Sequence, residues 1–320
     1  MISPVVRRAG LAVLVLGLAA APFLVDEYAI QTMSRILVFS LLAMSVNLLT
    51  GITGLPTLGQ SAYFGVGAYT AAIVSTTVTD IGIVALLVAG ALTALVALPT
   101  GWVAVRARGV AFLMITLAIG EIAFSAAVRW KAVTRGTDGY SGIPAVVPLP
   151  GMPSLQLDGL VYYWVLAVFL VLFVLMRLLV ASPFGLALRG IRDNEARMRA
   201  IGYPTTGYAL AGYCVAGALA GMAGSLYVSV QRFVSPGDAG FEIAALALLA
   251  VIIGGVGSMW GACVGAAVVI LTRDYLGGYV AGRASLLLGI LFVAAVYLLP
   301  RGIAGVRARW PVRARAGAQA

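Results

Sequence analysis

Charged residues concentrate in one connection between apolar segments, from Ser182 to Gly202, where they could bind another protein. The connection reads SPFGLALRGIRDNEARMRAIG and holds three oppositely charged pairs spaced four residues apart: Arg189 with Asp193, Asp193 with Arg197, and Glu195 with Arg199. Residues at this spacing are neighbours on a helix surface, where opposite charges stabilise the helix. Ser182-Pro183 is a helix-start signal and Gly202 a stop signal. We expect a short amphipathic helix, bent at Gly190 or near Asn194.

This helix has two interpretations. Its apolar residues lie on one face of the helix and its arginines flank that face, as in a helix that lies on lipid headgroups. The second interpretation is a docking element for a soluble partner. The carboxylates of Asp193 and Glu195 favour docking, because an anionic membrane surface would repel them.

The chain lacks the residues that several kinds of catalysis require. The chain has no His, the usual partner of a Ser or Cys nucleophile and the commonest metal ligand, and it lacks Gly-x-Ser-x-Gly. A P-loop needs Lys followed by Ser or Thr, but the single lysine, Lys131, precedes Ala132. We expect no catalytic residue, metal or cofactor in this chain. A motor driven by ATP would be a separate subunit.

Glycines interrupt an apolar stretch that reads LLTGITGLPTLGQSAYFGVGAYTAAI and includes Gly51, Gly54 and Gly59. Broken backbone is tolerated at membrane depth only where protein or a water-filled cavity satisfies its polar groups, so such segments indicate a translocation pathway. Close helix packing by small residues is the alternative. Both interpretations stay open. The repeats Gly217/Gly221 and Gly257/Gly261/Gly265 favour packing.

Three polar residues stand inside apolar segments: Asn47, Gln60 and Glu121. A charged side chain near the centre of a membrane helix costs about 2.5–3.5 kcal/mol on insertion scales. Glu121 is therefore expected to face the bundle interior or a cavity. Each of the three either makes structural hydrogen bonds or takes part in transport, and the sequence leaves both roles open.

The elements that must position these residues are membrane-spanning helices. The 320 residues are 62% hydrophobic and 10% charged, and the mean hydropathy is +1.05. A spanning helix needs roughly 20 apolar residues. We expect an all-α membrane bundle of about 8–10 spans in one domain, 1–320, drawn from ten segments at 10–25, 35–50, 60–79, 83–105, 109–128, 160–181, 207–230, 241–256, 259–275 and 284–300. The first, second, eighth and ninth are short enough to be re-entrant.

Arginine distribution predicts the orientation of these spans. If the chain starts inside, 14 of its 21 basic residues are cytoplasmic, as positive-inside topology requires. Both termini and a basic tail, 301–320, are then expected in the cytoplasm, with the connection 182–206. The loop 129–159 is expected outside. The net charge of +10 indicates topology and not nucleic-acid binding, because its residues are scattered between apolar runs.

Five stretches together resemble the LivM-type permeases of branched-chain amino-acid ABC importers. They are NLLTGITGLPTLGQSAYFGVGAYTAAI (47–73), RARGVAFLMITLAIGEI (106–122), TRGTDGYSGIP (134–144), SPFGLALRGIRDNEARMRAIG (182–202) and FVSPGDAGFEIAALALLAVIIGGVGSMWGACVGA (233–266). The resemblance covers nearly the whole chain in the family's order. It implies that 182–202 couples the chain to ATPases through Arg189, Arg192, Asp193, Asn194, Glu195, Ala196 and Gly202.

The same resemblance implies a set of partners. These are a LivH-type second permease, LivG- and LivF-type ATPases that bind ATP and Mg²⁺, and a periplasmic substrate-binding protein, around a bacterial inner-membrane core. Gly59-Gln60-Ser61 stands where relatives often have a Gly-His pair, and Thr134-Arg135-Gly136 replaces a more usual Thr-Gly-Gly. Urea, short amides or aromatic acids are therefore alternative substrates. A stand-alone secondary transporter or channel and an intramembrane enzyme are rivals of other classes.

Overall fold

The computed structural model describes residues 22, 26–276, 289, 293 and 302–303. Most of the expected first and tenth spans, 10–25 and 284–300, and of the basic tail, 301–320, lies outside the described residues. The described part is helical, with isolated bridges in place of strands. This confirms the expected all-α class.

Five described stretches are long and apolar enough to cross a membrane. They contain α2 (Glu27–Asn47) with the π-helix η2 (Leu48–Thr53), α4 (Gly82–Ala104), α5 (Val110–Arg129), α7 (Asp158–Ala181) and α9 (Thr205–Gln231). The chain is therefore a multi-pass membrane protein. The second expected span, 35–50, begins eight residues earlier than predicted, because Arg35 forms an ion pair with Asp274 inside the bundle and does not end the helix.

Three further helices are shorter or less apolar. They are α3 (Gln60–Thr77), α10 (Phe241–Gly254) and α11 (Met259–Leu271). The 14 residues of α10 and the 13 of α11 reach about 20 Å at 1.5 Å per residue, less than the roughly 30 Å hydrocarbon core. The eighth expected span is thus too short for a full crossing, whereas α11 continues without a break into the π-helix η5 (Thr272–Leu276). The short helix η4 (Pro236–Ala239) precedes α10 and packs against α3.

Small residues bring the central helices together. A Cβ on Gly67 of α3 would strike the backbone of Gly221 on α9, and one on Gly221 would strike Thr93 of α4. A Cβ on Gly261 of α11 would likewise strike the backbone of Gly254 on α10. The packing interpretation of the repeated glycines is confirmed at these positions, since close backbone approach is what small residues permit between membrane helices.

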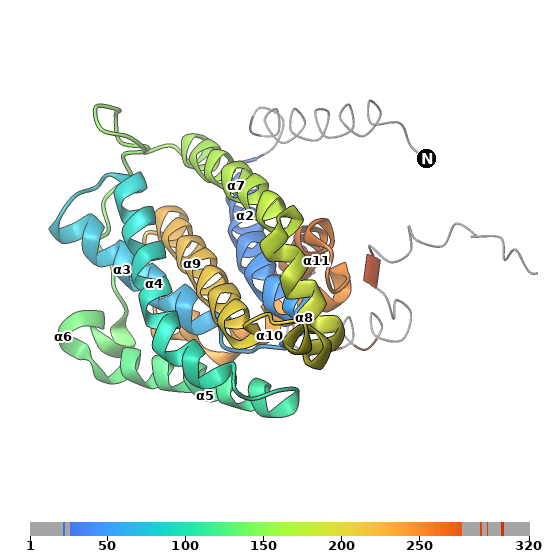
Figure 1. Cartoon of the computed structure of the whole chain (residues 1–320). Helices are drawn as coiled ribbons and strands as arrows, with labels where there is room; N and C mark the ends of the chain where they lie inside the picture. The colour runs from blue at the N-terminus through green and yellow to red at the C-terminus, as the bar shows by residue number, and fades with distance from the viewer. Residues whose placement is uncertain (1–21, 23–25, 277–288, 290–292, 294–301, 304–320) are drawn as a thin grey trace, which may run out of the picture.

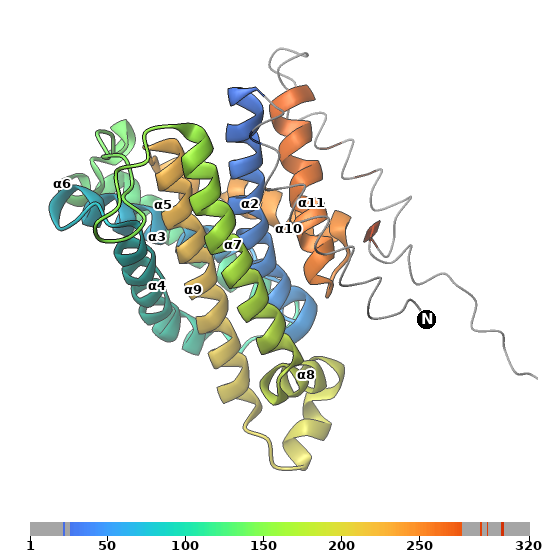
Figure 2. The ribbon, with the colours of Figure 1, turned by 90° about the horizontal axis from the view of Figure 1, so that it is seen from above.

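The two ends of the bundle differ. At one end, α6 (Lys131–Thr134), η3 (Gly136–Asp138) and the rest of loop 129–159 pack over the helices, with Tyr140 bridging to Val234 and Val147 to Ile81. At the opposite end, α8 (Pro183–Ala200) projects below α7 and α9 (Figure 2). In Figure 1, α7 and α2 lie beside each other, with α9 between them and α4.

Candidate functional site

The expected amphipathic helix is α8, and it is bent at Asn194. Proline at the first position, after Ser182, starts the helix, and Asn194 has φ −161° and ψ 95°, outside the helical region. Its Oδ1 accepts a hydrogen bond from the backbone N–H of Arg197 at 2.9 Å, which caps the second half. The two halves meet closely: a Cβ on Gly190 would lie 2.7 Å from the sulfur of Met198.

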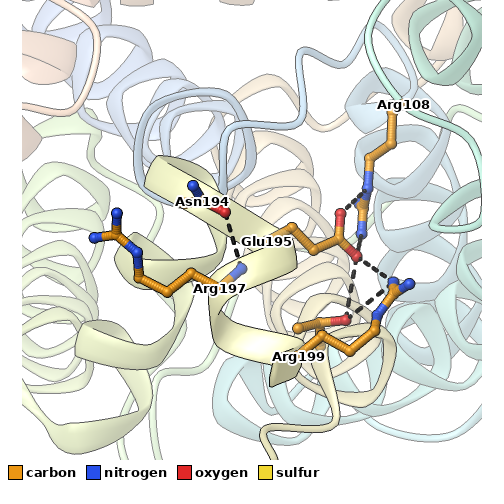
Figure 3. A network of polar contacts seen from close by, with 6 residues as sticks. Arg108, Asn194, Glu195, Arg197 and Arg199 are labelled. Atoms are coloured by element: carbon orange, nitrogen blue, oxygen red, sulfur yellow. Dashed lines mark hydrogen bonds and ion pairs between the residues drawn. The ribbon is translucent and has the colours of Figure 1, made fainter. Parts of the chain in front are cut away.

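Glu195 fastens the second half of α8 to the bundle (Figure 3). Its carboxylate accepts hydrogen bonds from Nε and Nη2 of Arg108, both at 2.7 Å, from Nη2 of Arg199 at 2.9 Å and from Oγ1 of Thr205 at 3.1 Å. The Arg108 fork is the geometry in which arginine binds carboxylates most strongly. Hydrogen bonding from Arg108 lowers the pKa of Glu195, aided by the nearby charges of Arg108 and Arg199 and by Thr205.

Only one of the three expected charge pairs along the helix forms in the described structure, between Glu195 and Arg199. The other two expectations are wrong. Asp193 accepts from Nε and Nη2 of its neighbour Arg192 at 3.0 and 2.9 Å, while Arg189 donates to the carbonyl of Val180 at 3.0 Å. The bend at position 194 separates Asp193 from Arg197, whereas Arg189, which lies before the bend like Asp193, binds the end of α7 instead. Asp193 keeps 67% of its side chain exposed.

Arg192 joins α8 to the glycine-interrupted segment. Its Nη1 donates to the carbonyl oxygen of Gly51 in η2 at 2.7 Å. Next to it, Gly54 ends η2 with φ 77°, and a Cβ there would lie 2.5 Å from Cγ of Arg192. Only glycine adopts this left-handed conformation without cost and leaves room for the arginine stem. A coupling candidate and two pathway candidates therefore form one contact.

Asn47 holds the other side of the same segment. It is fully buried, and its Oδ1 accepts a hydrogen bond from the backbone N–H of Gly257 at 2.8 Å. Gly51 lies between them, because a Cβ on Gly51 would strike both Asn47 Oδ1 and Gly257 N. Structural hydrogen bonding is thus observed for Asn47, and close packing for Gly51.

Gly59 and Gln60 lie where α3 begins, buried against α5. A Cβ on Gly59 would lie 2.8 Å from the carbonyl oxygen of Thr116. Gln60 is 1% exposed, yet among the described residues neither its Oε1 nor its Nε2 has a partner, and the same is true of the buried Oγ of Ser61. Buried polar groups are rarely left unpaired, so these atoms mark a place suited to water or to a passing polar solute.

Glu121 is not in the interior of this chain, which contradicts the expectation that it faces the bundle interior, whereas the alternative of a cavity stays a prediction. It lies on the exposed surface of α5, beside Ile122, which is 68% exposed. In the most apolar part of α5, only 22% of the residues are buried within this chain, against 89% for the stretch formed by α2 and η2. The helix α5 lies at the edge of the bundle, and Glu121 is on the side of α5 that faces away from the other helices of this chain. A carboxylate there is costly if lipid covers it.

The remaining sites are simpler, and two functional residues were missed. Ala196 and Gly202 are exposed, and Gly202, with φ 92°, follows the end of α8. Arg108 and Thr205 were not expected to contact Glu195. Arg108 was one of the 14 basic residues expected on the cytoplasmic side. No helical spacing connects it to a residue 87 positions away.

Comparisons with known proteins agree with this arrangement. Residues 28–296 match the family described as branched-chain amino acid transport system / permease component. The chain is 27% identical to the high-affinity branched-chain amino acid transport system permease protein LivM of Salmonella typhimurium and to that of Escherichia coli, over 94% of this chain and 76% of each relative.

A further relative is the probable branched-chain amino acid transport permease protein LivH of Methanocaldococcus jannaschii, 28% identical over 83% of this chain and 88% of that protein. No solved structure matched the chain significantly. The family is one of transport permeases and not of enzymes. The match across 28–296 therefore shows that the chain belongs to the branched-chain amino acid transport system permease family.

Proposed function

We propose that this chain is the membrane-spanning permease subunit of an ATP-driven importer for branched-chain amino acids. The observation that carries the mechanism is the Arg192–Gly51 hydrogen bond, which connects a helix outside the bundle to a broken helix within it. A displacement of α8 would move η2 through this bond, and the hydrogen bond between Asn47 and Gly257 would transmit the movement to the start of α11. Two-state movement of such a linked element is what coupling between distant sites requires.

The exposed side of α8 supplies the surface for the ATPases. Asp193, Ala196 and Arg197 are exposed, and Ile201 after the helix is 64% exposed. Glu195 faces the bundle and positions this surface. A mixed apolar and charged patch held by ion pairs suits a protein partner. We propose that LivG- and LivF-type ATPases, which would bind ATP and Mg²⁺, dock here, so that this end and both termini are cytoplasmic and the membrane is the bacterial inner membrane.

The exposed face of α5 is proposed to meet a second, LivH-type permease. A carboxylate at Glu121 would be poorly accommodated by lipid but can be solvated at a protein interface or in a water-filled path. Similarity of this chain to both LivM and LivH relatives supports pairing of two related subunits. The substrate path would then run between them, beside the unpaired Gln60. A periplasmic binding protein would deliver substrate at the end that carries loop 129–159.

The test is uptake of radiolabelled leucine into liposomes containing the complete complex, with ATP hydrolysis measured alongside. Arg192→Gln removes the donor to Gly51 and should reduce ATP-driven uptake at least tenfold while basal ATPase activity persists. Arg106→Gln, an exposed arginine outside α8, η2 and loop 129–159, is the matched control. Equal uptake by Arg192→Gln and wild type would overturn the coupling role. Uptake by the chain alone under an ion gradient would favour the stand-alone transporter.

A further inference from the structure

A cavity of about 490 Å³ lies far from α8, among residues of α2, α3, α9, η4, α10, α11 and the π-helix η5 (Thr272–Leu276). Its volume is in the range of about 300–1,000 Å³ that small-molecule sites occupy. Arg35 lines it and precedes Gly51 by 16 residues, about 24 Å of helix. The cavity is therefore on the side of the bundle where substrate would be delivered.

The cavity combines an apolar wall with charges of both signs. Its apolar wall is made by Val38, Phe39, Phe64, Ile243 and Ile270. Its charged residues are Arg35, Asp238, Arg273 and Asp274. Arg35 Nη1 is 3.2 Å from Asp274 Oδ2, and Arg273 is 3.4 Å from Glu242.

Asp238 is the lining carboxylate that these ion pairs leave over. Within the described part of the chain, no arginine or lysine lies at ion-pair distance from it. Hydrogen bonds nevertheless hold it in place: Oδ1 accepts from the Tyr227 hydroxyl at 3.0 Å, and Oδ2 from the backbone N–H of Ser235 at 2.8 Å. A fixed carboxylate inside a membrane bundle with no cationic partner favours a cation.

Arg35 has donors to spare. A guanidinium carries five N–H donors, and the protein contact observed for Arg35 uses Nη1. Its Nε is buried and has no partner within the described structure. Such a nitrogen, with the Nη on the same edge, is suited to bind a carboxylate in bidentate fashion. The cavity thus offers one unfilled contact for an anion and one for a cation.

We propose that this cavity binds an α-amino acid with an apolar side chain. The carboxylate of the ligand binds the Nε edge of Arg35, its ammonium group binds Asp238, and its side chain lies against Phe39, Phe64 and Ile270. The inference rests on the proposed function, because it names a substrate site for that transport. It makes this chain a direct contributor to specificity, in addition to the binding protein.

Binding of radiolabelled L-leucine to the purified complex, without the binding protein, tests the site. Asp238→Asn keeps the shape and most hydrogen bonds, and Arg35→Gln removes the anion contact. Each should weaken leucine affinity at least tenfold, the minimum for loss of a charge-assisted hydrogen bond. Asp80→Asn and Arg129→Gln alter exposed charges of the same types and should leave affinity within twofold. Thermal unfolding of each variant separates loss of binding from loss of folding.

Ligand analogues assign each contact. 4-Methylpentanoate lacks the ammonium group of leucine, and 3-methylbutylamine lacks its carboxylate. Wild type should prefer leucine to both, and Asp238→Asn should reduce the preference over 4-methylpentanoate at least tenfold while that over the amine persists. Unchanged preferences, or equal binding of a cation without a carboxylate, would overturn the site. If wild type transports leucine with ATP but the variants bind it normally, the cavity fails and the proposed function stands.

Discussion

Replacing Arg108 and Glu195 singly and together should reveal a coupling energy of about 1 kcal/mol. Exposed ion pairs usually contribute about 0.2–1 kcal/mol, because solvent screens them and ordering two side chains costs entropy. The Arg108–Glu195 pair belongs at the upper end of this range. It has two N–H···O contacts of 2.7 Å, and its side chains are 37% and 25% exposed.

The assay is denaturant unfolding of the purified chain in detergent, for wild type, Arg108→Gln, Glu195→Gln and the double variant. The double-mutant cycle isolates the pair from the other contacts of each residue. Glu195→Gln should cost more than Arg108→Gln, because the carboxylate also binds Arg199 and Thr205. The coupling should fall as salt rises from 0.1 to 1 M, where the Debye length shrinks from about 10 to about 3 Å.

A coupling energy below about 0.3 kcal/mol at low salt would refute the reasoning. So would a coupling that salt does not change, since it would then be packing and not charge that joins the residues. A second double-mutant cycle, of Arg197→Gln with Arg108→Gln, is the control. Arg197 is exposed on the same half-helix and only its backbone N–H contacts Asn194 in the described network, so this cycle should give no coupling.

Two further predictions use the same unfolding measurement. Gly51→Ala should destabilise the protein by about 1–3 kcal/mol, because its Cβ would strike Asn47 and the backbone of Gly257. Gly207→Ala is the control: a Cβ there meets open space, so this variant should be neutral or stabilising by up to about 1 kcal/mol. Similar losses at both positions would contradict the packing argument. The pKa of Glu195 is lowered in the folded state, so its stabilisation is complete above the ordinary carboxyl pKa of about 4.3 and is lost as pH falls through the lowered pKa. The stability difference between wild type and Glu195→Gln should be constant from pH 7 to 5 and shrink below about pH 4; a decline already at pH 6 would exclude this cause.

Local sequence was sufficient for features that arise within one segment. Composition alone indicates a membrane bundle, because several apolar stretches are long enough to span the hydrocarbon core of a bilayer. The proline after Ser182 and the amide of Asn194 start and bend α8 through contacts at most three residues away. The single Lys131 precedes no Ser or Thr, so the sequence alone predicts that an ATP-driven motor would be a separate subunit.

Tertiary structure decided which residues meet across the bundle. Helical spacing predicted three charge pairs, but Glu195 selects Arg108, 87 residues away, and Arg192 selects the Gly51 carbonyl, 141 residues away. Periodicity tells which side chains share a face but not which element that face contacts, so it could not show that Glu121 lies outside. The cavity around Arg35 and Asp238 likewise exists only because segments distant in sequence converge, and packing in three dimensions determines where they do.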